Sequence, residues 1–149
     1  MIEEFLNELS EEFKNIVDKK EIKGNFVVTV RKEDLKPIVE FTKKHGITHI
    51  ITITGVDKGD KIELNYHFRP LGTGKVITYR VYLDREKPQI TSISSVIPGA
   101  LLYEREVKDL LGVEFIGIPD ERTLLLPEDW PEEEKPLRRD FELKKYLEG

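Results

Sequence analysis

The stretch KIELNYHFRPLGTGKVITYRVYLD, residues 61–84, decides the fold. Apolar and polar side chains alternate in residues 61–69 and again in 75–84, so each run predicts a β-strand with one apolar face. A segment rich in Pro and Gly separates the two runs, and such residues rarely continue a central strand. We therefore expect an antiparallel hairpin of two long strands.

The patterns on both sides of this hairpin predict further helices and strands. Apolar residues spaced by three and four indicate helices, and alternating or β-branched runs indicate strands. Gly24, Gly46 and Gly112 stand where the helices are expected to end. The expected helices cover about residues 2–17, 33–45 and 100–111, and the further strands cover about 25–31, 47–54 and 90–93, the last of these extending the sheet.

The order α-β-α-β-β-β-α predicts an α+β (mixed α/β) fold, a single domain in which helices pack on a mostly antiparallel sheet. Residues 119–149 form a Pro-rich and strongly charged segment with little periodicity. A compact domain does not need such a segment. We expect a domain over residues 1–118 and an irregular, extended C-terminal segment over 119–149 that docks on a partner subunit.

Composition limits the possible functions of the 149-residue chain. A net charge of -5 argues against nucleic-acid binding, which requires an excess of clustered Lys and Arg. The chain has no cysteine, which excludes disulfides and thiolate ligands for zinc, iron–sulfur or nickel–iron centres within it. Any such redox centre would have to lie on a partner.

Apolar runs in the chain stay shorter than the ~20 residues that span a bilayer, and the first residues do not form a signal peptide. We therefore expect a cytosolic or peripheral protein. Gln and Met each occur once and Asn four times, while Lys and Glu are abundant. This bias is typical of proteins from thermophiles.

Charged residues are concentrated in the last expected helix. Glu104 with Lys108, and Arg105 with Asp109, have the i, i+4 spacing of helical ion pairs, which predicts a salt-bridged and solvated helix face. We also expect His67, on the polar side of its strand, to be a solvated surface residue.

The charged helix is part of a longer pattern, EREVKDLLGVEFIGIPD at residues 104–120 with PLRRDF at 136–141. This pattern resembles the signature of the 30 kDa (C-type) subunit of NADH:quinone oxidoreductases, which is shared by the equivalent subunit of membrane-bound energy-converting [NiFe] hydrogenases and formate hydrogenlyases. Ile118 and Leu102 depart from the family pattern, which usually has His and Trp there. The residues that coincide are Glu104, Arg105, Glu106, Asp109, Gly112, Gly117, Pro119, Asp120, Pro136, Leu137, Arg138, Asp140 and Phe141.

The resemblance implies an accessory subunit without a cofactor of its own, which packs against the large subunit that holds the quinone site or the [NiFe] site. Iron–sulfur subunits of the same complex would be further partners, and the chain would contact the membrane only through the complex, on its cytoplasmic side. Arg residues and aromatic anchors suit such an interface. The residues expected to form it are the matching ones above together with Trp130 and Arg139.

Two other functions remain open from the sequence. The chain could be a free-standing small enzyme that uses Glu104 or Glu106 as a general acid, which would require a pocket and a shifted pKa. It could also be a detached adaptor that uses the same fold to bind a soluble protein.

Overall fold

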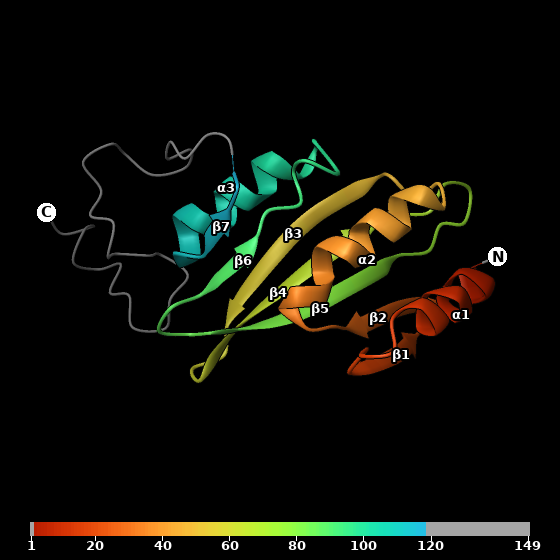
Figure 1. The fold of residues 1–149 in the computed structure, drawn as a ribbon, viewed down its shortest axis with the longest axis horizontal. Helices are drawn as coiled ribbons and strands as arrows, with labels where there is room; N and C mark the ends of the chain where they lie inside the picture. The colour runs from red at the N-terminus through yellow and green to blue at the C-terminus, as the bar shows by residue number, and fades with distance from the viewer. Residues whose placement is uncertain (1, 119–149) are drawn as a thin grey trace, which may run out of the picture.

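A computed structural model describes residues 2–118, which fold into a five-stranded sheet, a two-stranded sheet and three helices (Figure 1). The strand order in the larger sheet is β1-β2-β5-β4-β3, and β6 pairs with β7 in the smaller one. The elements are α1 (Ile2–Glu12), β1 (Asp18–Ile22), β2 (Asn25–Thr29), α2 (Lys32–Lys44), β3 (Ile50–Asp57), β4 (Lys61–Phe68), β5 (Ile77–Asp84), β6 (Gln89–Thr91), α3 (Ala100–Leu111) and β7 (Glu114–Ile116).

The predicted hairpin is confirmed as the centre of the larger sheet. β4 and β5 pair antiparallel over their whole length, from Lys61 opposite Asp84 to Phe68 opposite Ile77, and β3 extends this antiparallel unit on the other side of β4. β2 joins β5 in parallel, with Phe26 opposite Ile77, and β1 pairs antiparallel with β2. The expected α+β fold with a mostly antiparallel sheet is therefore confirmed.

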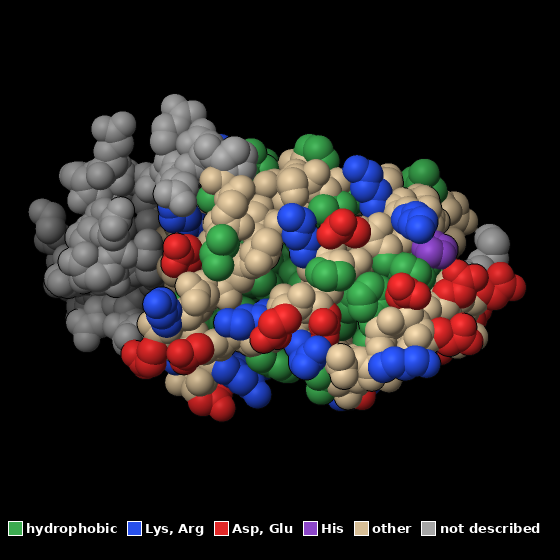
Figure 2. Space-filling view, viewed as in Figure 1, with side chains coloured by type: hydrophobic (Ala, Val, Ile, Leu, Met, Phe, Trp, Pro, Cys, Tyr) green, Lys and Arg blue, Asp and Glu red, His purple; other side chains and the backbone are tan. Residues whose placement is uncertain are grey.

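One face of the larger sheet carries the core. Ile62, Leu64, Tyr66 and Phe68 of β4 are all 0% exposed, as the alternation in this strand requires. Helices α1 and α2 lie over this side of the sheet, and α3 packs along β3 (Figure 1). On the helix-covered side, acidic and basic side chains are interspersed over the surface (Figure 2).

The opposite face is built from the alternate residues of the same strands. In residues 2–118 no helix packs on it (Figure 1). We call this surface the open face. Its central rows consist of Thr52, Thr54 and Val56 of β3, Glu63, Asn65 and His67 of β4, and Thr78, Arg80 and Tyr82 of β5.

Two expectations about the ends of the domain are wrong. The first helix stops at Glu12, and the strand β1 follows it, joined to β2 by a tight turn in which Lys23 and Gly24 have φ of 51° and 82°. β1 has the sequence DKKEI with every residue exposed, so it has no alternation that could have revealed it. The strand near Ile90 does not extend the larger sheet, because β6 pairs in parallel with β7 instead.

Candidate functional site: the α3 helix and the open face

Helix α3 carries the first part of the family signature. Val107 and Leu111 face the core, and the helix ends at Gly112, which has a left-handed φ of 79° and donates its N–H to the carbonyl of Lys108. This conformation suits glycine, which has no Cβ to clash. The chain then runs directly into β7, so the signature forms one continuous helix, turn and strand.

Glu104 is a buried residue, which corrects the prediction of a solvated face at this position. Its side chain is 0% exposed, one carboxylate oxygen accepts a hydrogen bond of 2.6 Å from Ser92 Oγ, and the other accepts one of 2.8 Å from the backbone N–H of Ile93. The expected pair of Glu104 with Lys108 is therefore wrong, since the carboxylate ties α3 to the segment that follows β6. The burial of Asp109, at 3%, also departs from a solvated face.

A sequence signal for this burial exists. Ala100, Glu104, Val107 and Leu111 are spaced by four, three and four residues, which places Glu104 on the apolar stripe of α3. A carboxylate on such a stripe must find hydrogen-bond donors inside the domain. The surrounding charged residues concealed this position in the sequence.

Burial raises the pKa of Glu104 above its ordinary value, although the hydrogen bonds from Ser92 and Ile93 act in the opposite direction. The hydroxyl of Tyr66 is buried without a hydrogen-bond partner in the described part of the chain. Burial and the nearby Glu104 charge raise the pKa of Tyr66 well above its usual range. Both groups therefore sit in a poorly solvated environment between α3 and the sheet.

The raised pKa of Glu104 predicts a pH-dependent stability. The folded chain keeps this proton over a pH range in which the unfolded chain releases it, so the contribution is complete below about pH 4.5 and is lost as the pH rises through the folded pKa. Glu104→Gln does not titrate, so the wild type should lose stability relative to this variant as the pH rises from about 4.5 through the folded pKa of Glu104. Denaturant unfolding of both proteins over this range measures the difference, and parallel pH profiles would contradict it.

Arg105 and Glu106 are half-buried and lie on the outer side of α3. Glu106 and Leu110 line a cavity of about 280 Å³ between this helix and β3, together with Thr52 and Thr54. Glu106 is therefore partly accessible beside the edge of the open face, whereas Nε of Arg105 is buried. Arg105 and Glu106 remain interface predictions, as does the pairing of Arg105 with Asp109.

The later part of the signature is only partly described. Gly117 is exposed and has a φ of 88°, and the following Ile118 is 8% exposed. The expected interface residues beyond it lie outside the described residues. These are Pro119, Asp120, Trp130, Pro136, Leu137, Arg138, Arg139, Asp140 and Phe141.

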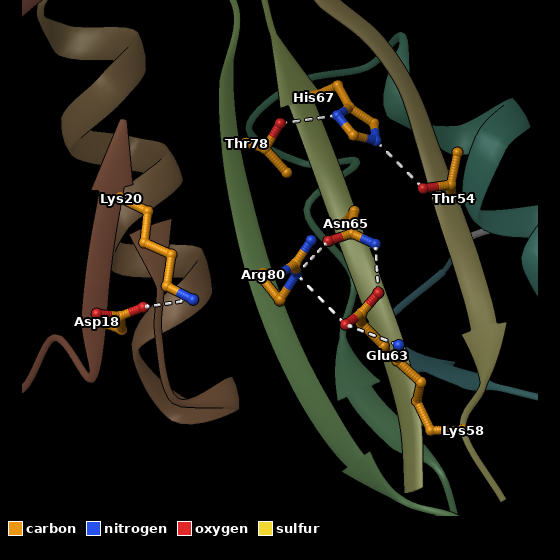
Figure 3. A network of polar contacts seen from close by, with 9 residues as sticks. All are labelled: Asp18, Lys20, Thr54, Lys58, Glu63, Asn65, His67, Thr78 and Arg80. Carbon is orange, nitrogen blue, oxygen red and sulfur yellow. Dashed lines mark hydrogen bonds and ion pairs between the residues drawn. The ribbon is translucent and has the colours of Figure 1, made fainter. Parts of the chain in front are cut away.

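The open face holds a network of polar side chains that the sequence did not predict (Figure 3). His67 is not a solvated residue, because its ring lies between two threonines: Nε2 is 3.1 Å from Thr54 Oγ1 and Nδ1 is 2.8 Å from Thr78 Oγ1. Burial, and then the positive charge of Arg80, lower the pKa of His67. The histidine is therefore neutral near pH 7.

Next to His67, the side chain of Arg80 contacts both Asn65 and Glu63. Its Nε donates a hydrogen bond of 2.8 Å to Asn65 Oδ1 and lies 3.4 Å from Glu63 Oε1, while Asn65 Nδ2 donates to Glu63 Oε2 at 3.1 Å (Figure 3). Lys58 Nζ lies 4.0 Å from the same Glu63 carboxylate. Glu63 and Asn65 are each 6% exposed, so the network is set into the sheet rather than standing above it.

Residues 2–118 contain no group of three or more His, Cys, Asp or Glu side chains placed to hold a metal ion. Within the same range, no helix has the length and apolar character needed to cross a membrane.

Comparison with known sequences identifies the family. Residues 28–147 match the family described as "Respiratory-chain NADH dehydrogenase, 30 Kd subunit". The chain is 31% identical over 144 residues to the C-type subunit of the NADH-quinone oxidoreductase of Moorella thermoacetica, a match that covers 95% of this chain and 96% of the relative. It is 36% identical over 145 residues to formate hydrogenlyase subunit 5 of Escherichia coli (strain K12), where the match covers 91% of this chain but spans only 25% of the relative.

Solved structures have the same fold. A chain of the membrane-bound sulfane sulfur reductase, an archaeal respiratory membrane complex, is similar with a TM-score of 0.86 and 23% identity, covering 98% of this chain and 88% of that one. A trypsin-resistant fragment of Nqo5 is similar with a TM-score of 0.70 and 26% identity, covering 80% of this chain and 98% of the fragment. The resemblance inferred from the signature is thus confirmed, and this chain belongs to the 30 kDa subunit family of the respiratory-chain NADH dehydrogenase.

Proposed function

We propose that this chain is a non-catalytic subunit of a membrane-associated electron-transfer complex, of the NADH:quinone oxidoreductase or energy-converting hydrogenase type, and that it stabilises the large subunit of that complex. The observation that carries the proposal is the match to the C-type subunit of an NADH-quinone oxidoreductase over 95% of this chain and 96% of the relative. The two chains therefore correspond over most of their lengths.

The formate hydrogenlyase relative supports a close association with a larger partner. There the matched region forms 25% of one longer polypeptide, so the same sequence pattern is covalently joined to the rest of that protein. A domain that is fused to its neighbour in one protein and separate in another is well suited to a stable contact between subunits.

The outer side of α3 and the segment 119–149 are the proposed contact with the large subunit. Arg105 and Glu106 are half-buried on α3, and the described residues end at Ile118, two residues after β7. Arg138 and Arg139 can form bidentate pairs with carboxylates of a partner, and Trp130 and Phe141 supply aromatic anchors. Glu104 acts inside the domain, where it holds this surface in place.

Partner subunits would supply the redox centres in this arrangement. Iron–sulfur clusters require thiolate ligands, and this chain has no cysteine. The quinone site or the [NiFe] site would belong to the large subunit, and iron–sulfur subunits would complete the complex. We propose that this chain is peripheral, on the cytoplasmic side, and reaches the membrane only through these partners.

The geometry at Glu104 disfavours the small-enzyme alternative. A raised pKa is one requirement of a general acid, but the residue is 0% exposed and both of its oxygens are engaged by Ser92 and Ile93. Glu106 reaches the cavity beside β3, but its surroundings there are threonine and apolar side chains. The adaptor alternative differs only in the identity of the partner.

Affinity isolation of the tagged full chain from mildly solubilised source membranes tests the proposal. We expect mass spectrometry to identify a large subunit, iron–sulfur subunits and integral membrane chains that co-purify with it. Recovery of the chain alone from the soluble fraction would contradict the proposal. Recovery with a single soluble protein would favour the adaptor.

Reversing the charges of Arg138 and Arg139 by substitution with Glu is expected to weaken this assembly. Because surface charge changes usually alter stability by no more than about 0.5 kcal/mol, the isolated variant should unfold at nearly the same denaturant concentration as the wild type. The recovery of the large subunit should fall strongly. The control is the double change Lys32→Glu and Lys36→Glu on α2, and a variant that unfolds on its own would assign the two arginines to contacts within the chain.

A further inference from the structure

We propose that the open face is a second protein-docking surface, and that its occupant is a subunit of the same complex that presents a carboxylate to Arg80 and apolar side chains to Val56 and Tyr82. This inference rests on the proposed function for the identity of the assembly. It assigns a separate surface, on the side of the sheet that carries no helix in residues 2–118.

The guanidinium of Arg80 carries the inference. Both of its contacts, with Asn65 at 2.8 Å and with Glu63 at 3.4 Å, run through Nε. Apart from these two residues, the guanidinium of Arg80 has no hydrogen-bond or ion-pair partner in residues 2–118. The two Nη groups therefore remain for an acceptor outside the domain, and the planar fork of arginine is suited to a carboxylate.

The network orients this fork before any partner binds. Asn65 and Glu63 hold Nε from below, and Glu63 is itself fixed by the amide of Asn65 (Figure 3). The side chain of Arg80 is 31% exposed, so it is partly immobilised in the sheet. An arginine that is already ordered loses less conformational entropy when it binds.

The cationic side chains on the open face are more exposed than the anionic one, which favours an acidic partner. The carboxylate of Glu63 lies at the base, with its side chain 8% exposed, whereas the side chains of Arg80 and Lys58 are 31% and 45% exposed. An approaching molecule therefore meets the two cations before the anion. His67 is neutral near pH 7 because its pKa is lowered, so it does not change this sign.

Apolar side chains flank the charged centre. Val56 and Tyr82 stand on either side of Glu63 in the same row of the sheet, and they are 42% and 38% exposed. Lys61 lies over the ring of Tyr82, 4.3 Å from its centroid. Tyrosine and arginine are enriched at protein interfaces, and an arginine in the row next to such apolar groups is shielded from water when a partner covers them.

Lysine reactivity in the wild-type protein gives a test that needs no substitution. The full chain, free and within the complex isolated from membranes, is acetylated with an N-hydroxysuccinimide ester and analysed by mass spectrometry. We expect the labelling of Lys58 and Lys61 to fall severalfold in the complex. Equal labelling of both lysines in the free and assembled chain would overturn the proposal.

Substitutions at Arg80 test the carboxylate contact. We expect Arg80→Glu to weaken binding to the complex by about tenfold or more, because it replaces the fork with a repelling charge. Arg80→Lys keeps the charge without the fork and should give an intermediate loss. The matched control is Lys36→Glu, a change of the same charge at a half-buried position on α2.

The outcomes separate this inference from the proposed function. Failure of the wild-type chain to recover any membrane complex would remove the proposed function itself. If the wild type and both folded Arg80 variants recover the complex equally well, the proposed function is retained and the docking surface is overturned. If Arg80→Glu does not fold, Arg80→Lys and the lysine labelling still decide the question.

Discussion

Replacing Glu104 with Ala is expected to lower the free energy of unfolding by about 3 kcal/mol or more. The change leaves the hydroxyl of Ser92 and the backbone N–H of Ile93 without the acceptors they have now, at 2.6 and 2.8 Å, inside a fully buried site. It also leaves a cavity where the side chain lay. Denaturant unfolding of the isolated chain at neutral pH measures the loss.

Two variants show whether the buried hydrogen bonds are the cause. Glu104→Gln keeps the size of the side chain and one oxygen acceptor, so it should be less destabilising than Glu104→Ala. Glu106→Ala, at a half-buried position on the outer side of the same helix, should change the free energy of unfolding by no more than about 0.5 kcal/mol. Equal losses for the Ala variants at both glutamates would contradict the role assigned to Glu104.

Replacing Gly55 with Ala is expected to lower the free energy of unfolding by about 1–3 kcal/mol, even though Gly is a poor strand residue. A Cβ at this position of β3 would overlap Cδ1 of Leu111 and come within 3.4 Å of Cδ2 of Leu64. Both leucines are 0% exposed and cannot move away freely. Relief of the overlap therefore requires the Leu111 side chain, or α3 with it, to shift away from β3.

A second glycine provides the control for this substitution. Gly99 precedes α3 with a φ of -63°, and the nearest atom to a Cβ there, Cγ2 of Ile50, would be 4.0 Å away. Gly99→Ala should therefore be nearly neutral in thermal unfolding, while Gly55→Ala lowers the melting temperature. If Gly55→Ala were as stable as the wild type, the close packing of α3 on β3 would not be rigid.

The parts of the fold that could be predicted have strong local patterns. The alternation in β4 and β5 was sufficient for the hairpin, because one face of those strands is fully buried. β1 could not be predicted, since an exposed and charged edge strand has no apolar face. The pairing of β6 with β7 depends on residues far apart in the chain, and no turn signal connects them.

The candidate site, like the fold, could be predicted only in part from the sequence. The signature on α3 was visible in the sequence, but the burial of Glu104 was missed because its charged neighbours dominated the interpretation of the helix. On the open face, only His67 was considered from the sequence, and it was expected to be a solvated surface residue. The low exposure of Glu63 and Asn65 depends on cross-strand contacts with Arg80, which only the register of β4 and β5 brings together.

The parallel pairing of β2 with β5 has a consequence for how the chain reaches its native state. β3, β4 and β5 follow one another in the sequence and can pair through short turns, whereas β2 must close a long loop to place Phe26 opposite Ile77. Contacts between distant segments form more slowly than local ones. During synthesis on the ribosome, β1 and β2 can therefore join the larger sheet only after β5 has emerged. The sheet grows from the antiparallel unit of β3, β4 and β5, although β1 and β2 are synthesised first.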